Sequence, residues 1–471
     1  MLTLADVIEG LLGQRPGAAG QPIRRFVIDS REAGPGDLFV AFSGEKTDGH
    51  FYVSEAFARG AVAALVEKDV PIDAQHVDLR PEATVPAIRS LSLPVLLRVD
   101  NTLRTLQELA RWWRSRFAQL RVIGITGSVG KSSTKELTAA VLQRQFNLLK
   151  SEGNLNNEIG LPLTLLQLDE THQRAVLEMG MYARGEIRRL CELARPVVGV
   201  VTIVSPVHLE RLGSIEAIAE AKAELPAALP PDGVAILNYD DERVRAMRHQ
   251  TPARVLTYGL DPQADLWADD INSEGLEGIR FTLHHQREVL HVQVPLLGRH
   301  SVHTSLRAAA VGLAEGMGWD AILEGLQDRR AALRLVAVPG PRGTTILDDT
   351  YNASPASMIA ALNLLSELNG RKIAVLGDML ELGDYEEEGH RLVGLRALDV
   401  ADVLVTVGAL GRLIAIVAIQ NGMPRDRVIM CETNAEAIAQ LDRLLQPNDL
   451  ILIKGSRGLH MEDIVNAFAR G

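Results

Sequence analysis

Cysteine is nearly absent from this chain. Only Cys191 and Cys431 occur in its 471 residues, they lie far apart, and neither belongs to a CxxC pair. Neither a disulfide framework nor a zinc site of the cysteine type is therefore indicated. Such sparse cysteine usage suits a reducing compartment, and we expect the chain to be cytoplasmic.

Long hydrophobic runs are also lacking. The longest, such as residues 197–204, fall far short of the roughly 20 residues that a membrane-spanning helix needs. The N-terminal segment MLTLADVIEGLL carries Asp6 where a signal peptide would be positively charged. We therefore expect neither a membrane anchor nor export.

An excess of positive charge is missing as well. The 49 basic residues are outnumbered by 60 acidic ones, for a net charge of -11, so nothing in the composition attracts nucleic acid or an anionic membrane. What is present is ordinary globular composition, with 46% hydrophobic and 23% charged residues. A chain of this length exceeds one hydrophobic core, and two or three domains are expected.

Apolar runs alternate with helical stretches along most of the chain, which predicts an α/β protein of three domains. Residues 1–103 form a small α/β domain in this interpretation, with a patternless, proline-dotted stretch from Lys68 to Leu93 and a helix from Asn101 through Arg116. Residues 104–334 carry the strand-like runs RVIGIT, RAVLEMG, VVGVVTIV and VAILN, which predict a mostly parallel sheet covered on both faces. Residues 264–297 have the pattern of hairpin strands.

The C-terminal domain, residues 335–471, repeats the alternating pattern. Its strand-like runs are TTILDD, KIAVLGD, VLVTVG, RVIMCE and DLILIKG. This pattern is typical of a doubly wound, Rossmann-like sheet. No GxGxxG motif follows the first of these strands, so dinucleotide binding is not predicted.

A phosphate-binding loop is the strongest motif. The segment GITGSVGKSSTKE follows an apolar strand and precedes a helix, in the pattern GxxxxGK[ST]. Its glycines let backbone amides approach phosphate oxygens, Lys131 would reach the β and γ phosphates of ATP, and Ser132 would coordinate Mg²⁺. The loop residues are Gly127, Ser128, Val129, Gly130, Lys131, Ser132 and Ser133. The alternative is a glycine-rich turn with an exposed lysine.

Six further polar residues lie in the middle domain. Glu178 ends an apolar strand, where a phosphate loop needs an acidic metal ligand, although it could be a carboxylate in an edge turn. Asn154, Asn156 and Asn157 offer amides to a polar ligand or form a simple turn. His208 lies in a loop at the carboxyl edge of the sheet, and Lys222 lies on the following helix. Taken singly, a satisfied polar histidine and a solvated lysine are the simpler interpretations.

Two loops of the C-terminal domain can bind an anion or a ribose. In DDTYNASPASM, Ser354 and Pro355 are predicted as the N-cap and first residue of a helix that follows Asp349 and Asn352. In KGSRGLHMEDI, the loop from Gly455 to Gly458 offers amides and Arg457. Either loop could serve for capping alone.

Taken together, these segments resemble the Mur ligases of peptidoglycan synthesis. The match includes GNLNNEIGLPLTLL, LEMGMYARGEI, HLERLGSIEAIAEAKAE, LDDTYNASPASMIAAL, LGDMLELG and IDSREAGPGDLFVAFSGEKTDGHFY, and it covers nearly the whole chain. The resemblance implies an ATP-dependent ligase that joins D-alanyl-D-alanine to UDP-N-acetylmuramoyl-tripeptide through an acyl phosphate. The first domain would bind the UDP-sugar, and the third would supply the nucleotide and D-alanyl-D-alanine side of a cleft.

The resemblance also implies roles for single residues. Lys131, Glu178, His208 and Lys222 would be the catalytic group, with two Mg²⁺ ions held by Ser132, Glu178, His208 and a carbamylated Lys222. The nucleotide would be contacted by Arg334, Asp349, Tyr351 and Asn352. The substrate would be held by Ser30, Arg31, Asp48, Gly49, His50, Asn154, Asn156 and Asn157. Ser301 and Thr304 replace two asparagines that relatives place near the adenine, which leaves that contact open.

Other interpretations stay open beside this one. A sibling ligase that adds a single amino acid, or an enzyme like folylpolyglutamate synthetase, is the nearest rival, although YNASPASM argues against both. A nucleotide-dependent switch that binds ATP without ligation is the rival from another class. A monomer is expected, and the sequence leaves open whether the third peptide residue is lysine or diaminopimelate.

Overall fold

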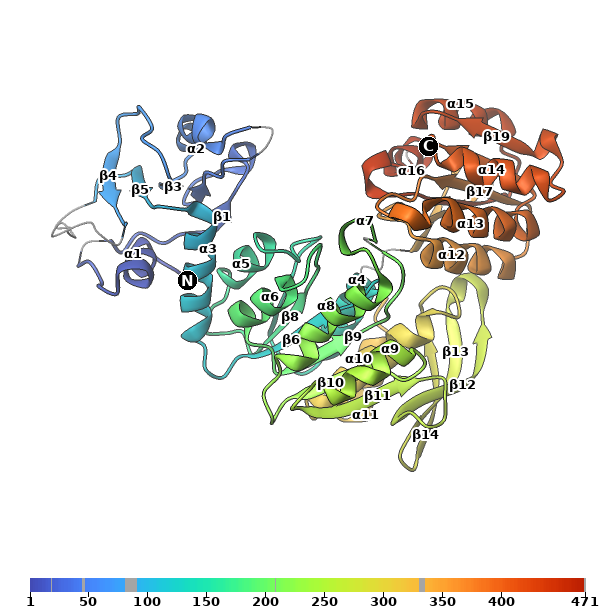
Figure 1. Ribbon diagram of the computed structural model, residues 1–471, viewed down its shortest axis with the longest axis horizontal. Coiled ribbons are helices and arrows are strands. Elements are labelled where there is room, and N and C mark those ends of the chain that lie inside the picture. The colour runs from blue at the N-terminus through green and yellow to red at the C-terminus, as the bar shows by residue number, and fades with distance from the viewer. Residues whose placement is uncertain (18, 45–46, 81–90, 208, 330–334, 470–471) are drawn as a thin grey trace. The chain divides into compact units, whose positions relative to one another are not determined.

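The structure is a computed structural model that describes residues 1–17, 19–44, 47–80, 91–207, 209–329 and 335–469. Its strands form three sheets of five, nine and six strands, connected largely through helices. Figure 1 shows this alternation along the whole chain. The predicted α/β class is confirmed.

The chain divides into two compact units. The first comprises residues 1–124, 146–180 and 186–197, and the second comprises residues 125–145, 181–185 and 198–471. The boundary predicted after residue 103 falls inside helix α3 (Thr102–Ser115), and the one after residue 334 lies at the edge of an undescribed segment. Both boundaries stay predictions.

The N-terminal sheet has the strand order β1-β2-β3-β5-β4, and all its neighbouring strands are parallel. Its elements are α1 (Leu4–Leu12), β1 (Phe26–Val27), β2 (Leu38–Val40), α2 (Val53–Ala58), β3 (Ala63–Val66), β4 (Gln75–Asp78) and β5 (Val95–Arg98). Helix α3 begins after its N-cap Asn101, as predicted, because the Asn101 side chain accepts from the Arg104 amide.

Strand β4 lies within the stretch from Lys68 to Leu93, for which no pattern was found. It is an edge strand that pairs only with β5, and Val77 is its one buried residue. A strand with so little burial has no clear hydrophobic alternation, so its sequence gives no signal.

The nine-stranded sheet has the order β14-β13-β12-β11-β10-β9-β6-β8-β7. Its strands are β6 (Arg121–Thr126), β7 (Leu148–Lys150), β8 (Arg174–Glu178), β9 (Val198–Val201), β10 (Val234–Asn238), β11 (Arg254–Gly259), β12 (Leu266–Ser273), β13 (Ile279–His285) and β14 (Glu288–Val294). Strands β12 to β14 are antiparallel neighbours, which confirms the hairpin pattern of residues 264–297. Strands β7 and β11 were not predicted.

The helices of this middle region connect the strands and end with a long, small-residue helix. They are α4 (Lys131–Leu142), α5 (Gly160–Leu165), α6 (Glu186–Ala194), α7 (Leu209–Leu212), α8 (Ile215–Ala227), α9 (Glu242–Ala246), α10 (Ser301–Ala314) and α11 (Trp319–Leu326). Helix α10 carries the run SLRAAAVGLA, whose small side chains allow it to pack closely against α4.

The C-terminal sheet has the order β15-β16-β20-β17-β18-β19. Its elements are β15 (Val336–Pro339), β16 (Thr345–Asp348), α12 (Pro355–Glu367), β17 (Lys372–Gly377), α13 (Glu386–Val400), β18 (Val403–Val407), α14 (Gly411–Gln420), β19 (Val428–Cys431), α15 (Asn434–Leu444), β20 (Leu450–Lys454) and α16 (Glu462–Ala469). Only β15 runs antiparallel to its neighbour. It was not predicted.

Residues alternate between the two faces of this last sheet. Ala374 and Leu376 pack with α12, α13 and α14, whereas Ile373 and Val375 pack with α15 and α16. Because both faces are covered, these strands are apolar throughout, which is why their runs were visible in the sequence.

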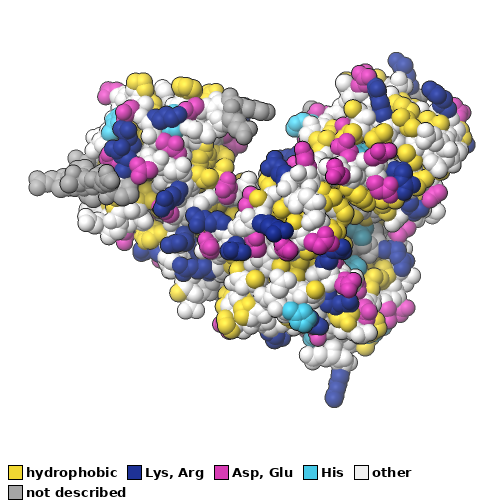
Figure 2. Space-filling model, in the orientation of Figure 1, with side chains coloured by type: hydrophobic (Ala, Val, Ile, Leu, Met, Phe, Trp, Pro, Cys, Tyr) yellow, Lys and Arg dark blue, Asp and Glu magenta, His cyan; other side chains and the backbone are white. Residues whose placement is uncertain are grey.

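Charged side chains of both signs are interspersed over the face drawn in Figure 2. No helix in the described part of the chain combines the length and the apolar character that a membrane span requires.

Candidate active site

The predicted phosphate loop joins β6 to α4. Gly127 and Gly130 both have positive φ, 146° and 83°, and Gly130 is the N-cap of α4. A Cβ on Gly127 would lie 1.8 Å from Thr202 Oγ1, so no larger residue fits there. The loop therefore has the strand, turn and helix that the motif requires, with the amides at the start of α4 available to an anion.

Residues that follow β9 hold this loop in place. The Ser128 amide donates to Ile203 O (2.8 Å), Ser128 Oγ donates to Ser205 O (3.0 Å), and Thr202 Oγ1 donates to Val129 O (2.6 Å). Sequence reasoning missed these contacts, since Thr202 and Ser205 lie more than 70 positions beyond the loop they support.

Lys131 lies across its own loop. Its Nζ donates to Gly127 O at 2.8 Å, which holds the ammonium beside the backbone that would receive phosphates. It also interacts electrostatically with Lys222. The structure thus places two predicted catalytic lysines close enough to interact electrostatically.

Lys222 is buried on α8, which begins after its N-cap Ser214. Its side chain is 2% exposed, so the interpretation as a solvated helix lysine is wrong. Burial, reinforced by the Lys131 cation, holds the pKa of Lys222 well below its usual range. Among the described residues, no hydrogen bond or ion pair involves this amine. His208 and Arg334 lie outside the described residues.

Glu178 belongs to the first unit and ends β8, as predicted. Its residue is 1% exposed, and Asn156 Nδ2 donates to its Oε1 at 2.9 Å. Asn157 Oδ1 instead accepts from the Gly160 amide (2.9 Å), and Asn154 O accepts from the Asn156 amide (2.7 Å). Of the three asparagines, Asn156 orients the carboxylate, and the other two shape the turn before α5.

The donor types fit Mg²⁺ bound together with phosphates. Mg²⁺ prefers oxygen ligands and is commonly held by one or two carboxylates plus substrate phosphates and water. Glu178 and the Ser132 hydroxyl are such donors. No group of three His, Cys, Asp or Glu residues suited to a metal occurs within the described ranges.

The two C-terminal loops meet through an ion pair. Lys454 Nζ lies 2.7 Å from Asp349 Oδ2 and donates to Asn352 O at 2.8 Å. Ser354 caps α12 with Pro355 as its first residue, as predicted. Sequence reasoning missed Lys454, although a lysine at the end of the apolar run DLILIK was a usable signal.

The ring of Tyr351 lies below the guanidinium of Arg457, 5.0 Å from its Cζ. This contact joins the same two loops a second time, because Tyr351 precedes α12 and Arg457 follows β20.

The polar side chains of the DGH segment form hydrogen bonds within the first domain. Asp48 Oδ1 accepts from the His50 ring at 2.5 Å and Oδ2 from Lys68 Nζ at 2.6 Å, and these donors hold the pKa of Asp48 below its usual range. His50 Nε2 accepts from the Glu67 amide, which leaves the ring proton on Nδ1. A Cβ on Gly49 would lie 2.9 Å from Phe42 backbone atoms. These residues build a rigid turn.

Ser30 and Arg31 also have local partners. Ser30 Oγ donates to Glu55 Oε2 (2.8 Å), and Arg31 pairs with Asp29 (2.6 Å). Arg31 is the exposed member of the set, so its guanidinium is accessible to a ligand.

Ser301 and Thr304, for which the adenine contact was left open, face inward. Ser301 Oγ donates to Leu297 O (2.7 Å), and Thr304 Oγ1 accepts from Arg307 (2.8 Å). Arg307 was not predicted as a site residue. A lone arginine within the small-residue run of α10 was the signal.

Comparison with known proteins agrees with this arrangement. Three family models match consecutive parts of the chain: the Mur ligase family catalytic domain (residues 22–111), the Mur ligase middle domain (125–312) and the Mur ligase glutamate ligase domain (333–457). A UDP-N-acetylmuramoyl-tripeptide–D-alanyl-D-alanine ligase of Bacillus subtilis is 36% identical over 466 residues, which cover 98% of this chain and 96% of the relative.

Solved structures give the same result. The crystal structure of MurF from Acinetobacter baumannii superposes with a TM-score of 0.84 at 32% identity, covering 99% of this chain and 98% of that one. A MurF ligase of Thermotoga maritima in complex with ADP reaches 0.77 at 27% identity, covering 95% and 97%. With three matched domains and full-length relatives above 30% identity, the chain belongs to the Mur ligase family.

Proposed function

We propose that this chain joins D-alanyl-D-alanine to the terminal carboxylate of UDP-N-acetylmuramoyl-tripeptide, with conversion of ATP to ADP and phosphate. The observation that carries the proposal is full-length similarity to ligases of that name together with an intact phosphate loop. The reaction belongs to cytoplasmic synthesis of peptidoglycan precursors, and a monomer is sufficient for it.

The first chemical step is phosphorylation of the substrate. A carboxylate oxygen of the tripeptide attacks the γ-phosphorus of ATP, and the bond from that phosphorus to the β-phosphate oxygen breaks. The products are an acyl phosphate and ADP. The amides that begin α4 and the Lys131 ammonium hold the β and γ phosphates and offset their charge. Without that offset, the attacking carboxylate would be repelled.

The second step forms the amide. The amine of D-alanyl-D-alanine attacks the acyl carbon, phosphate leaves, and the nitrogen loses a proton. No side-chain nucleophile is needed, so the role of the chain is to hold both reactants and to keep water from the acyl phosphate.

Metal ligands are assigned as part of this proposal. Mg²⁺ held by Ser132 and Glu178, and a second ion held by His208 and Lys222, would supply positive charge where the carboxylate approaches the phosphate. An ammonium cannot bind a cation, so Lys222 would have to be deprotonated or carbamylated. Burial holds the pKa of Lys222 well below its usual range, and the neutral form of an amine is the one that attacks CO₂ and loses one proton to give an anionic carbamate.

Substrate contacts complete the proposal. Arg334, Asp349 and Asn352 are assigned to the nucleotide, and Tyr351 lies in the same loop. The UDP-sugar is assigned to the rigid DGH turn and its neighbours, of which Arg31 is the exposed cation. The assigned set is Ser30, Arg31, Asp48, Gly49, His50, Asn154, Asn156 and Asn157.

The test is a reconstituted reaction followed by mass spectrometry and phosphate release. Purified chain with Mg²⁺, ATP and D-alanyl-D-alanine should convert UDP-N-acetylmuramoyl-tripeptide to the pentapeptide, and both lysine and diaminopimelate tripeptides should be offered. A single amino acid or a folate with glutamate replaces the dipeptide in parallel reactions. Product only in a parallel reaction would favour a rival ligase, and ATP binding without any product would favour a switch.

A further inference from the structure

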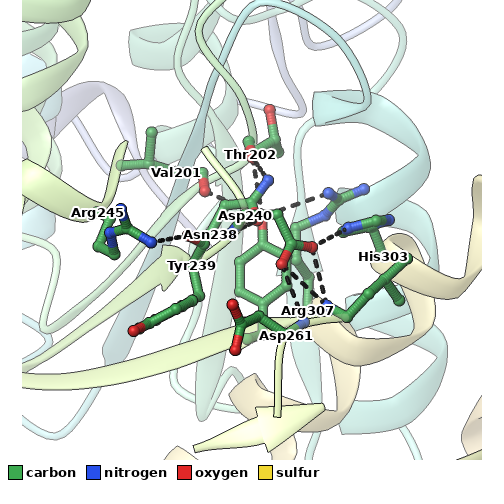
Figure 3. A network of polar contacts seen from close by, with 11 residues as sticks. Val201, Thr202, Asn238, Tyr239, Asp240, Arg245, Asp261, His303 and Arg307 are labelled. Atoms are coloured by element: carbon green, nitrogen blue, oxygen red, sulfur yellow. Dashed lines mark hydrogen bonds and ion pairs between the residues drawn. The ribbon is translucent and has the colours of Figure 1, made fainter. Parts of the chain in front are cut away.

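Arg307 is a buried cation surrounded by neutral groups. Its residue is 5% exposed on α10. Nε donates to Thr134 Oγ1 at 2.7 Å, Nη2 to Thr304 Oγ1 at 2.8 Å, and Nη1 approaches the Tyr258 hydroxyl at 3.4 Å. Figure 3 shows Arg307 within the polar network that includes Asp240 and His303.

No carboxylate neutralises this guanidinium among the residues that the structure describes, since none of their ion pairs includes Arg307. Asp240, in the same network, is committed elsewhere. It accepts from the His303 ring at 2.7 Å and from the amides of Leu260 and Asp261 (Figure 3). An isolated buried charge is costly unless something compensates it.

The guanidinium lies directly behind the phosphate loop. A Cβ on Gly130 would be 3.2 Å from Arg307 Nη2. Thr134 Oγ1, which accepts from Arg307, donates to Gly130 O at 2.6 Å. Arg307 is therefore one hydroxyl away from Gly130, the N-cap of α4, and its charge adds to the positive N-terminus of that helix.

Positive charge accumulates around this loop. Lys131 belongs to the loop, and Arg307 lies behind Gly130. In a poorly solvated site, such a set favours a ligand with several negative charges over one with few. The triphosphate of ATP is such a ligand.

We propose that Arg307 is a positioning residue for the nucleotide: through Thr134 and Gly130 it orders the phosphate loop, and its charge strengthens binding in proportion to the number of phosphates. The identity of the nucleotide as ATP rests on the proposed function. Arg307 itself touches no phosphate in this mechanism.

The first test measures dissociation constants of AMP, ADP and ATP for the full chain and for R307Q and R307K. R307Q should weaken the binding of ATP by about tenfold, that of ADP by less, and that of AMP hardly at all. R307K should retain most of the affinity for ATP. An equal loss for all three nucleotides, or no loss, would overturn the proposal.

A second pair of variants tests charge without removing the arginine. T304D places a carboxylate beside Nη2, whereas T304N offers an uncharged acceptor at the same position. With inorganic tripolyphosphate as the probe, which contains no adenine, T304D should bind about tenfold more weakly than T304N. Because T304D pairs a buried cation, it should melt no lower than T304N. Equal tripolyphosphate affinity of the two variants would reject the charge effect even if R307Q did not fold.

Arg114 is the matched control. It is buried to a similar degree, but it donates to the carbonyl oxygens of Ala194, Phe117 and Leu120. R114Q should lower the melting temperature. The ratios among the dissociation constants of AMP, ADP and ATP should stay as in the wild-type chain. Failure of the wild-type chain to bind ATP would refute the proposed function, whereas wild-type binding with an unaltered series in R307Q would refute only the role of Arg307.

Discussion

Two buried lysines in this molecule have neighbours of opposite charge. Lys454 and Lys222 are each 2% exposed, yet Lys454 contacts the Asp349 carboxylate and a backbone carbonyl, whereas the described neighbourhood of Lys222 provides a second cation. A lysine paired with a carboxylate stays charged and stabilises the loops that it joins. A buried lysine beside another cation favours its neutral amine, which is a reactive group. Burial alone therefore does not distinguish a lysine that stabilises the fold from a lysine that takes part in the reaction.

The largest effect is expected from K222M. Removing the amine removes the proposed carbamate, so turnover should fall by about a thousandfold or more, while the Kd of ATP changes by less than about tenfold. Steady-state kinetics and nucleotide titration measure the two quantities. K454M serves as the matched variant, and a K222M enzyme with normal turnover would contradict the chemical role.

Stability should respond in the opposite order. K454M leaves the Asp349 carboxylate without its partner and should lower the free energy of unfolding by about 2 kcal/mol. K222M replaces a buried amine, for which the described residues provide no hydrogen bond or ion pair, with an apolar side chain and should cost nothing or raise stability. Denaturant titrations of both variants check this. Equal losses would mean that Lys222 has a structural partner after all.

Removal of CO₂ should affect the activity that depends on Lys222 and should not affect Lys454. Wild-type enzyme prepared in degassed, hydrogencarbonate-free buffer should lose activity several-fold, and added hydrogencarbonate should restore it, because carbamate formation is reversible. The melting temperature should not change beyond the scatter of the measurement. Carbon NMR with labelled CO₂ should show one carbamate signal that K222M lacks and K454M keeps. Activity independent of CO₂ would remove carbamylation from the proposal.

The smallest effect is the coupling between Asp349 and Lys454. The double variant D349N/K454M should be more stable than the sum of the single changes predicts, by about 1 kcal/mol, because the pair is partly exposed on the Asp349 side. A thermodynamic cycle from four denaturant titrations gives this value. Strict additivity would show that the ion pair contributes no net stability.

Local features of the site were predictable from sequence. The glycines of the phosphate loop, the cap at Ser354 and Pro355, and the carboxylate that ends β8 all depend on residues close together in the chain. The roles of three asparagines were not separable in this way. Asn156 supports Glu178 only because β8 returns beside its turn, whereas Asn157 accepts from the amide of Gly160, three residues away.

By itself, the sequence determined where strands, turns and helix starts occur, because those features follow from periodicity and from the conformational limits of glycine, proline and capping side chains. Only the tertiary structure decided the surroundings of each charge. The segment EAKAE has the composition of a solvated helix face, yet packing buries Lys222, and Arg307 reaches Thr134 across 173 positions of chain. Electrostatic environment depends on distance in space and on exclusion of water, and neither quantity is encoded in local spacing.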